Sequence, residues 1–81
     1  MERIRRPIRV AVVFEPGNRI VPKWFELDRC KHEVCETTYQ WRDWAGKALR
    51  LHFAVSDGQA LYELVYHTGD QSWSLVAMEA T

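Results

Sequence analysis

Residues 48–67, ALRLHFAVSDGQALYELVYH, decide the fold class of this chain. In both halves of the stretch apolar side chains recur at every second position, as they do at Leu51 and Phe53. A period of two places alternate side chains on the two faces of a β-strand, whereas a helix would scatter them. Asp57-Gly58 stands between the halves and favours a tight type I′ turn. The stretch therefore predicts a β-hairpin with one apolar face.

The same alternation extends over most of the chain, and short turns, most of them with a glycine, separate its segments. We expect no helix longer than a turn. The long third segment changes phase near Cys35-Glu36, which predicts a β-bulge that bends the strand. The prediction is an all-β fold, a six-stranded antiparallel meander curled into a small barrel, closed or incomplete. The expected strands are residues 4–15, 19–27, 31–43, 47–56, 60–67 and 71–78.

Length and composition indicate a single small β domain over residues 1–81, in which residues 1–7 form a basic arm or the start of a strand. The chain has a mass of 9.6 kDa, 47% hydrophobic residues, and eleven basic residues against eleven acidic ones. The longest apolar run, Val10 to Phe14, has five residues, whereas a membrane-spanning helix needs roughly 20. We therefore expect a cytoplasmic protein that binds no membrane and whose two cysteines are thiols.

Two cysteines and a histidine form the stretch Cys30-x-His32-x-x-Cys35. A structural zinc site takes four ligands, commonly as a tight pair repeated elsewhere in the chain. No second cluster of this kind follows, and the other two histidines lie alone in different predicted strands. We therefore expect the cysteines to act as small apolar residues, and we predict no metal site and no cofactor.

No stretch of the sequence carries a catalytic signature. His52, Ser56 and Asp57 are close in the chain, but neighbours on a strand point in opposed directions. A catalytic triad needs its base within hydrogen-bond reach of the nucleophile. Neither a glycine-rich phosphate loop nor an H-E-x-x-H motif is present. We therefore expect no enzymatic activity and predict no catalytic residue.

Basic residues are concentrated at the N-terminus, where four arginines fall within nine residues beside one acid. A guanidinium group can bind a phosphate through two hydrogen bonds. Small β-barrels bind single-stranded nucleic acid by stacking its bases on exposed aromatic rings. The arginines equally suit the start of a strand, where charge protects a sheet edge from unwanted pairing. Weak nucleic-acid binding is therefore the alternative function. Its candidate residues are Arg3, Arg5, Arg6, Arg9, Arg42, Trp44, Arg50 and His52.

The alternation assigns Phe14, with Ile8, Val10 and Val12, to the inward face of the first strand. A second set of apolar residues then falls on outward faces, and a cluster of such residues would mark a partner surface. The preferred function is therefore a non-catalytic protein-interaction module, which binds a partner protein or a second copy of itself. The interaction candidates are Val13, Trp24, Trp44 and Val65.

A series of core and turn motifs runs along the chain: IRV at 8–10, FEPG at 14–17, PKWFE at 22–26, TTYQW at 37–41, HFAVSDG at 52–58, LYEL at 61–64 and WSL at 73–75. In these motifs the chain resembles a family of short bacterial all-β proteins of unassigned function, over residues 8–76. The family pattern has an aromatic residue, usually tyrosine, at the position of His32 and lacks Cys30 and Cys35. The resemblance therefore implies no family-wide role for the cysteines.

A more distant resemblance rests on the spacing of a Trp-Phe strand, a central tryptophan, a Tyr-x-Leu strand and a final Trp-x-Leu. These are residues 24–25, Trp41, residues 62–64 and residues 73–75. This spacing is similar to that of a small domain appended to polymerase-like proteins of bacterial mutagenic repair. The likeness implies a context in nucleic-acid metabolism and gives no residue a function.

Overall fold

The computed structural model describes residues 2–80, with side chains from residue 4 onward. Within this range the chain forms seven strands and no helix, so it holds no helical segment that could cross a membrane. Every strand pair is antiparallel, which confirms the predicted all-β antiparallel class. The strands are β1 (Glu2–Glu15), β2 (Arg19–Leu27), β3 (Cys30–Glu33), β4 (Glu36–Ala45), β5 (Ala48–Ser56), β6 (Ala60–His67) and β7 (Ser72–Ala80).

The hairpin predicted from residues 48–67 is present as β5–β6, but its turn differs from the prediction. A type I′ turn needs positive φ at both central residues. Gly58 has a φ of 93°, whereas Asp57 lies outside the positive-φ region. The Asp57 carboxylate instead accepts hydrogen bonds from the amides of Gln59 and Ala60, each at 2.9 Å. An aspartate side chain that binds amides further along the chain therefore shapes this turn.

The predicted third strand, residues 31–43, is two strands, so the sheet has seven strands and not six. Val34 and Cys35 leave the ladder between β3 and β4. The Val34 amide donates to the carbonyl of Lys23 at 3.0 Å, and the Cys35 amide donates to the carbonyl of Ser56 at 2.8 Å. These two bonds attach consecutive residues to two different strands, β2 and β5. The phase change in the sequence therefore marks the point where the chain leaves β3 and enters β4. A register irregularity follows near the start of β4.

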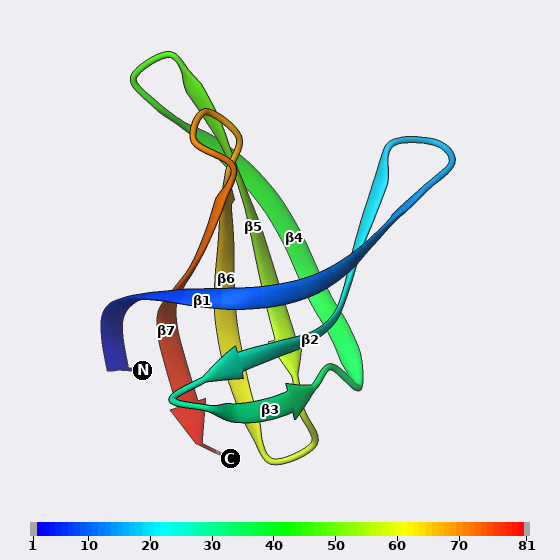
Figure 1. The fold of residues 1–81 in the computed structure, drawn as a ribbon, viewed down its shortest axis with the longest axis vertical. Coiled ribbons are helices and arrows are strands. Elements are labelled where there is room, and N and C mark those ends of the chain that lie inside the picture. Colours follow the sequence, from blue (N-terminus) through cyan, green and yellow to red (C-terminus); the bar gives the residue numbers. More distant parts are fainter. Residues whose placement is uncertain (1, 81) are drawn as a thin grey trace.

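Strand β1 gives the sheet its shape, because it pairs with β7 up to Ile8 and with β2 from Arg9 onward. The strand order is β3-β2-β1-β7-β6-β5-β4. The sheet is open because its end strands, β3 and β4, do not pair, so the predicted barrel does not close. Figure 1 shows β1 crossing in front of the other long strands together with β2 and β3. We call residues 9–33 the hairpin layer and the sheet of β4–β7 the main layer.

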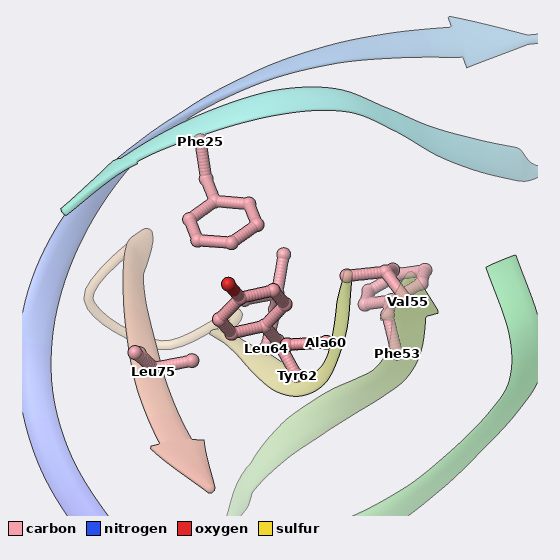
Figure 2. Close-up of a cluster of buried hydrophobic side chains, with 7 residues drawn as sticks. All are labelled: Phe25, Phe53, Val55, Ala60, Tyr62, Leu64 and Leu75. Atoms are coloured by element: carbon pink, nitrogen blue, oxygen red, sulfur yellow. The ribbon is translucent and has the colours of Figure 1, made fainter. Parts of the chain in front are cut away.

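The hydrophobic core lies between these two layers. Phe25 comes from the hairpin layer, and Phe53, Val55, Leu64 and Leu75 come from the main layer; each exposes at most 2% of its surface. Figure 2 shows Phe25 reaching from β2 toward the side chains of the opposite layer. Burial of a large apolar side chain stabilises the fold by roughly 1.5–3 kcal/mol. The contact between the layers is therefore what holds the hairpin layer in place.

Candidate functional site

The first candidate site lies where β4 forms one end of the sheet. Among residues 2–80, β4 pairs only with β5. Its register places Arg42 opposite Leu51 and Trp44 opposite Leu49. Paired residues of antiparallel strands share a face, and Leu51 packs against the core. Arg42 and Trp44 therefore lie on the core side of the main layer, beyond the edge of the core.

The tip of the β1–β2 hairpin also has a face that is turned toward the core side, opposite the inner face of β4. Phe14 lies opposite Ile20, and Ile20 packs against the core. Phe14 therefore shares the inner face, as its place in the alternation predicted. It nevertheless exposes 66% of its surface, as does Trp44 on β4. Each layer thus extends past the core and carries one exposed aromatic ring on its inner side.

A cavity of about 270 Å³ lies between these two inner surfaces. Ile20, Leu51 and Phe53 form its apolar wall. Polar side chains complete the lining; among them are Asn18 of the hairpin tip and Gln40 and Arg42 of β4. Phe14 and Trp44 do not line the cavity but adjoin its lining residues, Phe14 as the cross-strand neighbour of Ile20 and Trp44 two positions beyond Arg42 on β4. We call the cavity, together with these two rings, the open mouth. It has room for an apolar side chain of a partner, with polar groups placed at its edge.

A larger hollow, of about 900 Å³, lies on the opposite face of the main layer. At its centre His52 exposes 7% of its surface and stacks on Trp41 with ring centroids 5.0 Å apart. His52 Nδ1 lies 3.1 Å from Glu63 Oε2, and Nε2 lies 2.9 Å from Asp43 Oδ1. The two ring nitrogens of His52 therefore bridge the carboxyl groups of Glu63 and Asp43.

Arg50 completes this network. Its Nε and Nη2 atoms donate to the two oxygens of Asp43 at 2.8 and 2.6 Å. The hydrogen bonds from Arg50 and then from His52 lower the pKa of Asp43 to about 2. Arg50 and His52 thus contact Asp43 and Glu63, and every buried polar side-chain atom in the described region has a partner. The polar groups of the outer hollow therefore already have hydrogen-bond partners within the domain.

A second polar cluster joins β3 to the β5–β6 turn. Asp57 Oδ2 accepts the Tyr62 hydroxyl at 3.0 Å and lies 3.1 Å from His32 Nδ1. Burial raises the pKa of Asp57, but hydrogen bonds from the Gln59 amide, His32 and other donors outweigh it and lower the pKa to about 2. His32 also stacks on Phe25 at 4.9 Å between ring centroids. Tyr62 is buried, so this cluster links β3 to the β5–β6 turn through hydrogen bonds at the edge of the core.

The predicted interaction residues do not form one patch. Val13 and Trp24 lie on the outer side of the hairpin layer, because their ladder positions alternate with those of Phe14 and Phe25. Val65 lines the outer hollow and exposes 7% of its surface. Of the four candidates, Trp44 alone belongs to the open mouth, and its predicted outward placement is wrong, because its ladder position opposite Leu49 lies on the inner face. Sequence alternation predicted that Phe14 faces inward. No signal in the sequence shows that the opposite layer ends before it covers this ring.

The predicted nucleic-acid residues are spread over several surfaces. In β1, Arg6 pairs with Asp28 and Arg9 lies 3.5 Å from Glu26, while the side chain of Arg3 is outside the described residues. Arg5, Arg50 and His52 line the outer hollow, and Arg42 and Trp44 belong to the open mouth. The structure therefore gathers no continuous basic surface from these residues.

Cys30 is the first residue of β3, and Cys35 lies between β3 and β4. Both are free, exposed thiols, so the expectation that they act as small apolar residues of the interior is wrong. Among the described residues, no group of three histidine, cysteine or acidic side chains has the geometry to hold a metal ion.

Comparisons with known proteins return no match: no family model, curated protein or solved structure is similar to the chain at a significant level.

Proposed function

We propose that this domain is a non-catalytic protein-interaction module that receives an extended segment of a partner protein at the open mouth, as a strand added to β4. One observation carries the proposal. Trp44 exposes 66% of its surface on the inner side of β4, a strand whose outer edge has no neighbour among residues 2–80, and Phe14 exposes the same fraction on the inner side of the hairpin layer. Burying either ring would contribute roughly 1.5–3 kcal/mol to binding.

The backbone of β4 supports the strand-addition mode. A ladder on one side leaves N–H and C=O groups along the other side free to pair with an extended peptide. Edge strands usually carry charges or bulges that prevent such pairing. In β4 the irregularity lies before Tyr39, and Asp43 is turned to the outer face, where Arg50 and His52 hold it. Between Tyr39 and Ala45 the edge therefore carries little protection beyond Arg42.

Nucleic acid is the less favoured partner. A polyanion gains affinity from several unpaired cations that release counterions on binding. Arg6, Arg9 and Arg50 each lie close to an acidic side chain. The chain as a whole has a formal net charge of zero. These charges support a protein partner, and a salt-sensitive affinity for oligonucleotides would contradict this choice.

A display library of short random peptides tests the proposal. Peptides are selected on the wild-type protein and then measured against Trp44→Glu and Tyr39→Glu. Tyr39 is the matched control, because it lies on the same strand, exposes 65% of its surface and faces the outer side. We expect Trp44→Glu to abolish binding and Tyr39→Glu to retain most of it. Equal losses in the two variants, or no selected peptides at all, would contradict the proposal.

A further inference from the structure

The inner face of β4 suggests what chemistry an added strand would carry. Gln40, Arg42 and Trp44 occupy successive inner positions of β4, since their partners on β5 are Phe53, Leu51 and Leu49. A strand paired with β4 would also place every second side chain inside, about 4.5–5.5 Å from its cross-strand neighbour. Three consecutive inward side chains of the partner would therefore lie opposite Gln40, Arg42 and Trp44 in turn.

Arg42 determines which side chain fits the middle one of these three partner positions. It is exposed and lines the cavity of the open mouth. No acidic side chain among residues 4–80 forms an ion pair with it, whereas Arg19 at the hairpin tip lies 3.6 Å from Glu15. An opposite charge directly across a ladder stabilises strand pairing, and a like charge destabilises it. A carboxylate on the partner is the group that complements Arg42.

Apolar side chains fit the positions on both sides of that carboxylate. Opposite Trp44, an aromatic or aliphatic side chain would cover a ring that is two-thirds exposed. Opposite Gln40, the cavity of about 270 Å³ offers Ile20 and Phe53 as apolar contacts. An aliphatic side chain fills such a space at the least cost, because it brings no polar group that would need a hydrogen-bond partner.

We infer that the segment received at the open mouth has an acidic side chain between two apolar ones on its inward face, in the pattern apolar-x-Asp/Glu-x-apolar. This inference rests on the proposed function, because it presumes that a strand adds to β4. It names the partner by chemistry, as an extended segment of alternating character with one carboxylate. A second copy of the chain does not offer this pattern at either of its end strands, because the inner positions of β3 are Cys30 and His32 and β4 carries Arg42 where the carboxylate is needed.

The test selects peptides from the same random library on three proteins: wild type, Arg42→Glu and Arg29→Glu. Arg29 is the matched control, because it is an exposed arginine in the β2–β3 turn, outside the open mouth. Peptides selected on wild type and on Arg29→Glu should show the acidic position, and those selected on Arg42→Glu should show lysine or arginine there. In the best wild-type peptide, glutamine in place of the acid should weaken binding about threefold, and lysine about tenfold.

The outcomes separate the two proposals. Peptides that are selected and lost with Trp44→Glu, but show no acidic position, would overturn the inference and leave strand addition standing. Peptides whose charge preference is the same on wild type and on Arg42→Glu would also overturn it. A library that yields no peptide on any of the three proteins would overturn the proposed function together with the inference.

Discussion

Phe14 of the hairpin layer and Trp44 of the main layer both face the side on which the core lies, yet each exposes 66% of its surface. A small domain normally places its large apolar side chains where they leave water, because each one contributes strongly to a limited core. The two rings lie beyond the overlap of the layers, at the open mouth. The same physical chemistry that buries Phe25 and Phe53 therefore favours covering this surface with another chain.

The first prediction compares two phenylalanines of the hairpin layer. Phe25→Ala should lower the free energy of unfolding by about 3–5 kcal/mol, because it empties the centre of the core. Phe14→Ala should change it by no more than about 0.5 kcal/mol, because that ring is largely in water. Urea unfolding followed by tryptophan fluorescence measures both values. A large loss in Phe14→Ala would mean that this ring already supports the fold and is not free for a partner.

The second prediction concerns the buried histidine of the outer hollow. His52→Phe keeps a ring against Trp41 but removes both ring nitrogens, so Glu63 loses its hydrogen-bond partner in a largely buried position. We expect the free energy of unfolding to fall by about 1–3 kcal/mol. Adding Glu63→Leu should recover much of that loss, since the unpaired carboxylate is then gone. A double variant that is less stable than His52→Phe alone would contradict this account.

The third prediction follows from Asp57. Its pKa is about 2 in the folded protein, below the ordinary value of 3.8. A lowered pKa stabilises the fold above the unfolded value, and this stabilisation is lost as the pH falls through the folded value. The free energy of unfolding should therefore decline from about pH 4 to about pH 2, and Asp57→Asn should make that decline shallower without removing it, because the pKa of Asp43 is lowered too. Glu36→Gln, at an exposed carboxylate, is the control and should keep the wild-type slope.

The fourth prediction concerns the alkaline side. Burial, and then the nearby charge and hydrogen bond of Asp57, raise the pKa of Tyr62 from 10.0 to about 12. A raised pKa stabilises the fold below the unfolded value, and this stabilisation is lost as the pH rises through the folded value. Stability should therefore fall between pH 10 and about pH 12. Tyr62→Phe should flatten this fall, whereas Tyr39→Phe should not; urea unfolding across this range measures both.

Much of the fold could be predicted from the sequence, because the alternation of residues 48–67 is a local signal and sheet faces follow from it. The split of residues 31–43 could not be predicted. It depends on amides of Val34 and Cys35 that bind carbonyls of Lys23 and Ser56, and these partners lie on two strands far from each other in sequence. A change of phase in the alternation is equally consistent with a β-bulge inside one strand and with a break between two strands.

The candidate site was less predictable than the fold. Trp44 was predicted to be an interaction residue on an outward face, together with residues that the structure places on other surfaces, but it lies on the inner face. Alternation gave the correct face for Phe14, and it does not show how far the opposite layer extends. Phe14 follows the inward pattern and is nevertheless exposed, because the layers do not overlap at the hairpin tip. Only the packing of the two layers reveals this surface.

Amide hydrogen exchange measured by NMR, with and without a peptide selected on the wild-type protein, tests the central claim most directly. If the peptide adds as a strand to β4, amides between Tyr39 and Ala45 that exchange quickly in the free protein should become protected in the complex. Amides of β7, at the centre of the sheet, should change little. Protection confined to the outer hollow or to β3, with β4 unchanged, would contradict the claim that the open mouth receives the partner.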